Sequence, residues 1–159
     1  MENVDQNVKG NIEMIATLEK ALGMGASLAE LHGITTDTLE SMYSIAFDFY
    51  QKEKLEEAEL FFKFLCIYDF KNSNYLKGYA AVCQLQKKYE KALELYHMSL
   101  NMNNECDFSI IYHIGQCLMG LKKIESAMEC FKVIIEYCED ENLKDLAQTY
   151  IELFTKNND

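Results

Sequence analysis

The sequence contains no proline. Chains made of short strands and tight turns usually need some proline, whereas short helices can be joined by Asn, Asp, Ser and Gly. At 159 residues the chain has the length of one domain, and its 49% hydrophobic and 12% aromatic content is enough to form a core. The composition therefore favours a single helical domain.

Arginine is also absent. All 15 basic residues are lysines, they face 26 acidic residues, and the formal net charge is -11. Proteins that bind nucleic acid neutralise phosphates with Lys and Arg, so this balance argues against a nucleic-acid partner. The guanidinium group that grips a carboxylate or phosphate through two hydrogen bonds is missing as well.

The six cysteines include no CxxC pair, and most of them lie on apolar helical stripes, where a reduced cysteine acts as a small hydrophobe. Their spacing predicts no metal site, and a reducing cytosol accounts for them. The polar, acidic first ten residues do not resemble a secretory signal, and the apolar runs are too short to span a bilayer. We expect a cytoplasmic protein that binds no cofactor and no membrane.

A catalytic site is not expected either. The three histidines, His32, His97 and His113, fall on different units of the chain, and no Gly-rich phosphate loop or metal motif accompanies them. A structural or groove-edge role fits each histidine better than catalysis. The sequence therefore predicts a protein that is not an enzyme.

The strongest signal in the chain is a repeat. Ala58, Ala92 and Ala127 are spaced by 34 and 35 residues, and each is followed four residues later by an aromatic residue. The preceding helix repeats in the same phase, as a large-x-x-large-small-x-x-large pattern. Its members are Met42, Ile45, Ala46 and Phe49, then Leu76, Tyr79, Ala80 and Cys83, then Ile111, Ile114, Gly115 and Leu118. This pattern is typical of the paired helices of a tetratricopeptide repeat, although the usual proline after the second helix is missing.

The pattern predicts an all-α superhelix with three tetratricopeptide repeats over 39–140. Residues 1–10 are expected to form a flexible tail, 11–38 an N-terminal helical segment that can dock on a second copy of the chain, and 141–159 a capping helix. Charge-rich turns are expected at 52–54, 86–88 and 121–123. Asp37 with Glu40 resembles a capping box, and Asn72 or Ser73, and Asp107, can cap the next two first helices.

The first helix of the first repeat carries a second apolar stripe. At about 100° per residue, Tyr43, Phe47 and Tyr50 lie on a different side from the stripe that the repeat needs for packing. Either these rings pack against the N-terminal helix, or they line a hydrophobic groove that binds a peptide. Each aromatic ring can bury on the order of 150–250 Å². The groove is the sharper hypothesis.

Equivalent positions in the later repeats extend this groove. They are Lys77, Ala81 and Gln84 in the second repeat and Tyr112, Gln116 and Met119 in the third. The small side chain of Ala81 would leave space at the base of the groove, and Gln84 and Gln116 could pair with the backbone of an extended ligand. Repeat domains that clamp a terminal carboxylate place Lys, Arg and Asn here, so a clamp of that kind is not expected.

Beyond these patterns, the chain from Gly25 onwards resembles the class II chaperones of type III secretion systems, which escort translocator proteins. The residues that carry the resemblance are Gly25-Ala26-Ser27-Leu28, His32-Gly33-Ile34, Phe47-Asp48-Phe49-Tyr50, 57–62, Phe64-Leu65-Cys66-Ile67-Tyr68-Asp69-Phe70, 80–85 and Gly115-Gln116-Cys117. The run through 61–70 is the most specific of them, because ordinary tetratricopeptide repeats do not carry it.

The resemblance implies a function. Such chaperones bind hydrophobic translocators in the bacterial cytoplasm, hold an extended client segment in a concave groove and keep the client soluble and secretion-competent. Tyr43, Phe47 and Tyr50 match the pocket-lining aromatics of the family, and Tyr112, His113 and Gln116 match by position, while Lys77 replaces a usual apolar residue. Members often form homodimers. The alternative is a repeat adaptor, or a co-activator acting mainly through an AraC-type transcription regulator.

Overall fold

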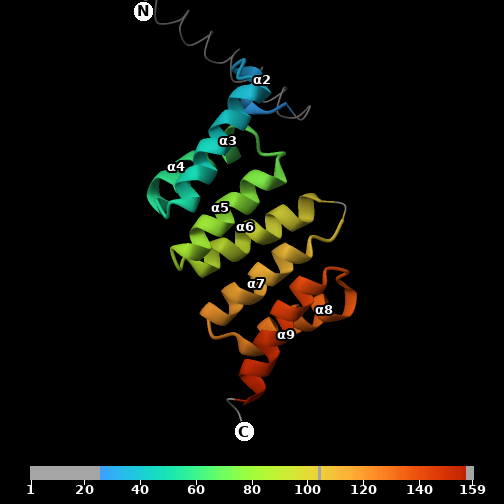
Figure 1. Cartoon of the computed structure of the whole chain (residues 1–159). Coiled ribbons are helices and arrows are strands. Elements are labelled where there is room, and N and C mark those ends of the chain that lie inside the picture. The colour runs from blue at the N-terminus through green and yellow to red at the C-terminus, as the bar shows by residue number, and fades with distance from the viewer. Residues whose placement is uncertain (1–25, 104, 157–159) are drawn as a thin grey trace, which may run out of the picture.

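The structure, a computed structural model, describes residues 26–103 and 105–156. Every regular element in these ranges is a helix, so the expected all-α class is confirmed (Figure 1). The helices are α2 (Leu28–Leu31), α3 (Thr36–Gln51), α4 (Leu55–Tyr68), α5 (Ser73–Leu85), α6 (Tyr89–Met102), α7 (Phe108–Gly120), α8 (Ile124–Tyr137) and α9 (Glu141–Lys156). The expected tail over 1–10 and the expected helix over 11–24 lie outside the described residues.

The helices stack as a row of hairpins. The pairs α3/α4, α5/α6 and α7/α8 follow one another along the molecule, and α9 packs against α8 at the C-terminal end (Figure 1). The first helices also touch one another, α3 with α5 and α5 with α7. They therefore line a common face, as in other solenoids whose units contact only their neighbours.

The turn within each hairpin has the same geometry, at the places where the sequence predicts charged turns. Glu53, Lys87 and Lys122 adopt left-handed φ angles of 56°, 61° and 60°. The next residue of each turn donates its N–H back into the helix, as in the bonds from Lys54 to Phe49 O and from Lys88 to Cys83 O, both 2.9 Å. This is the Schellman end of a helix, with a charged residue at the position where glycine is usual.

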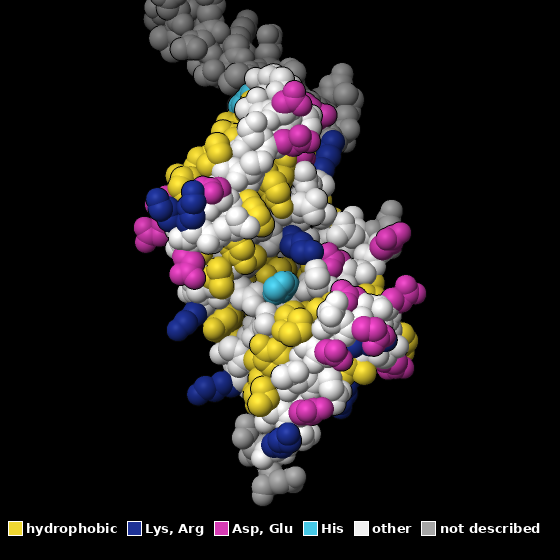
Figure 2. Space-filling model, viewed as in Figure 1, with side chains coloured by type: hydrophobic (Ala, Val, Ile, Leu, Met, Phe, Trp, Pro, Cys, Tyr) yellow, Lys and Arg dark blue, Asp and Glu magenta, His cyan; other side chains and the backbone are white. Residues whose placement is uncertain are grey.

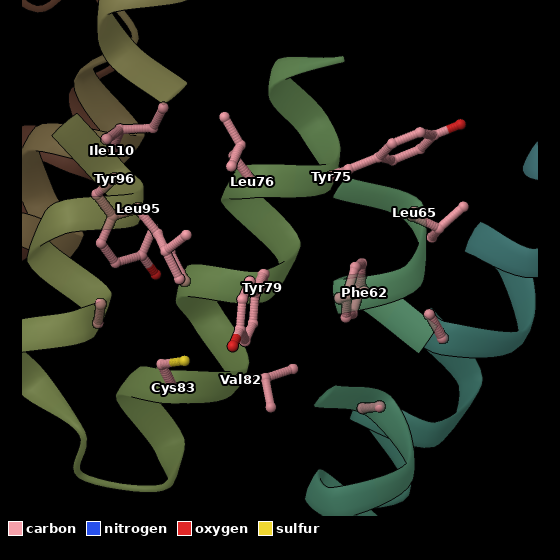
Figure 3. Packing of buried hydrophobic residues seen from close by; sticks show 14 of the residues in the cluster. Phe62, Leu65, Tyr75, Leu76, Tyr79, Val82, Cys83, Leu95, Tyr96 and Ile110 are labelled. Atoms are coloured by element: carbon pink, nitrogen blue, oxygen red, sulfur yellow. The ribbon is translucent and has the colours of Figure 1, made fainter. Parts of the chain in front are cut away.

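Small residues allow the helices to approach closely, as the repeat predicts. Ala46, Ala80, Ala58, Ala92 and Ala127 are completely buried. The aromatic residues four positions after the last three alanines are buried as well: Phe62, Tyr96 and Phe131. Figure 3 shows how Phe62 and Tyr96 lie on opposite sides of α5, among Leu65, Tyr79, Val82 and Cys83.

Two local predictions are wrong. Ile45, assigned to the packing stripe, is 44% exposed, because within the described residues no earlier hairpin precedes α3. Its counterparts Tyr79 and Ile114 are buried. The cap of α3 is Thr35, which accepts from Thr38 N at 3.2 Å, so the capping box at Asp37 does not form.

The other caps agree with the sequence. Asn72 caps α5 and Asp107 caps α7, each through a side chain that accepts from the first turn. A capping box does form one helix earlier, between Ser27 and Glu30 of α2. All six cysteines are free, and burial raises the pKa of Cys66 and of Cys117 to about 12. These two thiols are therefore protonated and pack as apolar groups.

Candidate functional site

An open cavity of about 170 Å³ lies between α3, α5 and α7, and we call it the aromatic cavity. Its wall consists of Tyr43, Phe47, Tyr50, Phe62, Asn74, Lys77, Gly78, Ala81, Tyr96 and His113. On the face seen in Figure 2, hydrophobic side chains extend along the molecule, with a histidine and a basic side chain among them. Most of the wall is apolar, so the cavity suits an apolar group.

The three rings of the second stripe all reach this wall, but they are not equally free. Phe47 is 45% exposed and stacks on Tyr50 with ring centroids 6.1 Å apart. Tyr43 is half-buried, because its ring meets Phe62 edge-on at 5.9 Å and lies 5.6 Å from Tyr75. Phe47 is thus the ring most available to a ligand, while Tyr43 also belongs to the core. The alternative contact of these rings with residues 11–24 lies outside the described residues.

Four wall residues are absent from the expected set: Phe62, Asn74, Gly78 and Tyr96. Phe62 and Tyr96 look like pure packing residues in the sequence, because they occupy the aromatic position of the repeat. Gly78 allows the backbone of α5 to lie close to the ring of Phe62 on α4. A Cβ at this position would lie 2.6 Å from Cζ of Phe62 and closer still to Cε1. The absence of a side chain at 78 lets Phe62 form the floor of the cavity.

Lys77 lines the cavity with its charge already paired. Its Nζ donates to Oδ2 of Asp107 at 2.7 Å and to Oγ of Ser109 at 2.8 Å. Partial burial raises the pKa of Asp107, but the hydrogen bonds from Lys77 and Ser109 outweigh it, and the pKa is lower than usual. Asp107 also caps α7, so one carboxylate fixes both the start of α7 and the position of the Lys77 ammonium group.

Gln84 and Gln116 do not face a ligand as free amides. Gln84 Nε2 donates to Gln116 Oε1 at 2.9 Å, and Gln84 Oε1 accepts from Tyr96 OH at 2.8 Å. Gln116 Nε2 donates to Tyr150 OH at 3.1 Å. This amide chain, which runs Tyr96–Gln84–Gln116–Tyr150, links α6, α5, α7 and α9, so both amides already have partners within the protein. Their pairing with a client backbone stays a prediction.

His113 joins the amide chain to the aromatic cavity. Its Nδ1 lies 3.1 Å from Gln116 Oε1, and its ring stacks on Tyr96 with centroids 5.6 Å apart and planes 6° from parallel. Burial, together with the nearby Lys77 charge, lowers the pKa of His113. The imidazole is therefore neutral at neutral pH.

Among the expected site residues, the structure gathers Tyr43, Phe47, Tyr50, Lys77, Ala81 and His113 around the aromatic cavity. Gln84, Tyr112, Gln116 and Met119 do not line it. Tyr112 packs edge-on against Tyr150 at 5.9 Å, and Met119 packs with it in the C-terminal core. The role of the whole set in binding remains a prediction.

Two further features of the described residues bear on function. They contain no group of three or more His, Cys, Asp or Glu placed to hold a metal ion. None of the described helices is long and apolar enough to cross a membrane.

Comparison with known proteins identifies the family. The model of the tetratricopeptide repeat matches residues 39–72 and 73–105, which are the first two hairpins. The chaperone protein SicA of Salmonella typhimurium is 42% identical over 132 residues, which are 83% of this chain and 79% of that protein. The chain belongs to the class II translocator chaperones of type III secretion. An uncharacterised Escherichia coli protein, YgeG, is 49% identical, and the match covers 89% of this chain and 87% of YgeG.

Solved structures of the family share the fold. The translocator chaperone SycD of Yersinia enterocolitica has a TM-score of 0.69 and 26% identity. The match covers 82% of this chain and 98% of the SycD chain. PcrH of Pseudomonas aeruginosa, solved in complex with the chaperone-binding region of PopD, has a TM-score of 0.71 and 27% identity. That match covers 80% of this chain and 98% of PcrH. The tetratricopeptide architecture is therefore confirmed.

Proposed function

We propose that this protein is a chaperone that works in the bacterial cytoplasm for a type III secretion system. It binds hydrophobic translocator proteins through an extended client segment and keeps them soluble and secretion-competent. The aromatic cavity carries this proposal, since it offers one apolar side chain a place on the face shared by α3, α5 and α7. PcrH is solved with chaperone-binding regions of PopD and of PopB, and SycD with a peptide of YopD.

The size of the cavity sets the energy it can supply. An apolar cavity of about 150 Å³ holds one benzene molecule, so a cavity of about 170 Å³ has room for one branched or aromatic side chain. Complete burial of a Leu, Ile, Met or Phe side chain is worth about 1.5–3 kcal/mol. A single anchor of this size gives weak binding, so the client segment needs further contacts along the groove.

The test compares two variants on the same helix. Phe47 and Ile45 of α3 are 45% and 44% exposed, but only Phe47 lines the cavity. We expect Phe47→Ala to weaken binding of the PopD chaperone-binding region by about ten-fold or more, since part of the anchor's burial is lost. Ile45→Ala should leave the affinity within two-fold. Isothermal titration calorimetry measures both, with circular dichroism as the check on folding.

Equal losses in the two variants would contradict the groove and point to a general effect on α3. A second readout is the solubility of a co-expressed hydrophobic translocator, which the wild-type protein should maintain and Phe47→Ala should not. An adaptor or a co-activator would leave the translocator insoluble in both cases. No observation on the described residues, and none of the relatives named above, favours an AraC-type regulator as partner.

The chaperone is also proposed to form a homodimer, as SycD does in its alternative dimer. On its outer side helix α4 exposes two large apolar side chains, Leu60 at 67% and Ile67 at 59%, with Lys63 between them. Exposed apolar side chains that lie together often mark a protein interface. We expect the double substitution of Leu60 and Ile67 by Glu to give a monomer in analytical ultracentrifugation, whereas Glu in place of Leu85, exposed on α5, should not.

A further inference from the structure

The hydrogen bonds around Gln116 decide which nitrogen of His113 carries the proton. Gln116 Nε2 donates to Tyr150 OH, so the atom facing His113 is the carbonyl oxygen Oε1, which already accepts from Gln84 Nε2. A carbonyl oxygen can only accept. With the amides in this orientation, the 3.1 Å contact makes His113 Nδ1 the donor. In a neutral imidazole only one nitrogen is protonated, so Nε2 is left as an acceptor.

The ring cannot easily turn away from this arrangement. Tyr96 stacks on one side of it at 5.6 Å, and Tyr112 meets it edge-on at 5.8 Å. Nδ1 is directed to Gln116, which does not line the aromatic cavity, while the ring itself does. Because Nδ1 is taken up by Gln116, Nε2 is the ring nitrogen left for a ligand in the cavity. Nε2 has no hydrogen-bond partner among the described residues.

We propose that His113 Nε2 is a fixed hydrogen-bond acceptor that selects a client residue with a free backbone N–H next to its apolar anchor side chain. This inference rests on the proposed function and assigns His113 a specificity role within it. A client residue that fills the cavity displaces the water that would otherwise satisfy Nε2. Leaving a polar atom unpaired on binding is costly, so a client residue without the N–H is disfavoured.

The available donors favour the peptide backbone over a charged client side chain. Lys77 lines the same wall, so a client ammonium group at this point would be a second cation beside one that Asp107 already neutralises. The Lys77 ammonium group in turn is paired with Asp107 and Ser109 and supplies no acceptor. An uncharged backbone N–H of an extended client segment can donate to His113 Nε2 without adding a charge beside Lys77.

The first test uses the free full-length protein and needs no client. Long-range ¹H–¹⁵N NMR spectra at neutral pH distinguish the two tautomers of each histidine, and the His113 signals are assigned by their loss in His113→Phe. We expect the proton on Nδ1 and an unprotonated Nε2. A proton on Nε2, or a rapidly exchanging mixture, would overturn the proposal. In Gln116→Met, which removes the accepting oxygen, the proton should move largely to Nε2.

The second test is a double-substitution cycle with the PopD chaperone-binding region. Each backbone amide of the peptide is replaced in turn by an ester, which removes one N–H. One ester should weaken binding to the wild-type protein by about five- to a hundred-fold, yet change binding to His113→Phe by less than two-fold. Phe keeps the stacking on Tyr96. If every ester affects both proteins alike, His113 accepts no client N–H.

The two tests separate this inference from the proposed function. A wild-type protein that shows no affinity for the PopD region counts against the proposed function, and the tautomer then decides the inference alone. If His113→Phe does not fold, Gln116→Met replaces it in the cycle, because it disturbs the tautomer and keeps the imidazole. In that variant the sensitive ester position should lose most of its effect, and an unchanged effect would refute the role of Nε2.

Discussion

Glu59 is the one charged residue that is buried in the described part of the chain. It lies on α4 with 8% of its surface exposed, and its carboxylate accepts from Lys63 at 2.7 Å and from Lys88 at 2.9 Å, with Lys91 at 4.0 Å. Lys88 belongs to the second hairpin, so the carboxylate ties the first hairpin to the next. Burial alone would raise the pKa of Glu59, but the hydrogen bonds from Lys63, Lys88 and Gln86 bring it down to about 2.

The size of this effect follows from the pKa. A fall from 4.5 to about 2 corresponds to about 3.4 kcal/mol, at 1.36 kcal/mol per pKa unit. The three lysines are about half exposed, and water screens their charges, so we expect a smaller value of about 2 kcal/mol. Glu59→Gln, which keeps the shape and removes the charge, should lower the free energy of unfolding by this amount at pH 7.

The pH dependence gives a second check. Because the folded-state pKa is depressed, the stabilisation is fully present above pH 4.5 and is lost as the pH falls through about 2. The difference between the wild-type protein and Glu59→Gln should therefore shrink between pH 4.5 and 2. Urea unfolding followed by circular dichroism measures it. Glu94→Gln, an exposed position on α6, is the control and should stay within about 0.5 kcal/mol of wild type. A Glu59→Gln variant as stable as this control, or a difference that does not change with pH, would refute the reasoning.

Two further predictions concern the backbone. Lys87→Gly should raise the free energy of unfolding by about 0.5–1 kcal/mol in urea titrations, because glycine adopts the left-handed φ of 61° without strain; Lys87→Ala removes the same charge but keeps Cβ, and should give no such gain. Gly78→Ala should lower the melting temperature, since the overlap of its Cβ with the Phe62 ring costs about 1–3 kcal/mol and outweighs the gain of about 1 kcal/mol in helix propensity. A melting temperature at or above that of the wild-type protein would show that Phe62 moves aside freely.

The repeat could be predicted from sequence because its residues are constrained by packing at fixed positions. Ala58, Ala92 and Ala127 are all fully buried, and the turns fall where the charged residues interrupt the apolar pattern. Ile45 was misassigned because periodicity assumes a neighbour on each side. Tyr79 is buried beside Glu59 of the preceding hairpin, whereas the described structure provides no such hairpin for Ile45.

The amide chain could not be predicted, because hydrogen bonds between side chains depend on which atoms meet across repeats. The sequence predicts Gln84 and Gln116 on the groove side of their helices. It does not show that the two amides are close enough to satisfy each other at 2.9 Å. Two free amides and two paired amides have the same sequence pattern, and only the stagger between α5 and α7 distinguishes them.

That stagger also relates the cavity residues of α5 to those of α7. Equivalent positions of the second and third repeats are 35 residues apart, yet Gln84 bonds to Gln116 and Lys77 to Ser109, both 32 residues apart. The shift of three residues is about one helical turn. Applied to Ala81, the same offset leads to His113, which lines the cavity with it.

An offset of 31, one turn less than the 34-residue spacing of the first two repeats, relates the cavity residues of α3 to those of α5. It leads from Tyr43 to Asn74, from Phe47 to Gly78 and from Tyr50 to Ala81. The cavity therefore forms where a bulky ring on one first helix faces a small or polar residue one turn back on the next. A search for the pair Phe47 and Gly78, rather than for equivalent positions, would have located it.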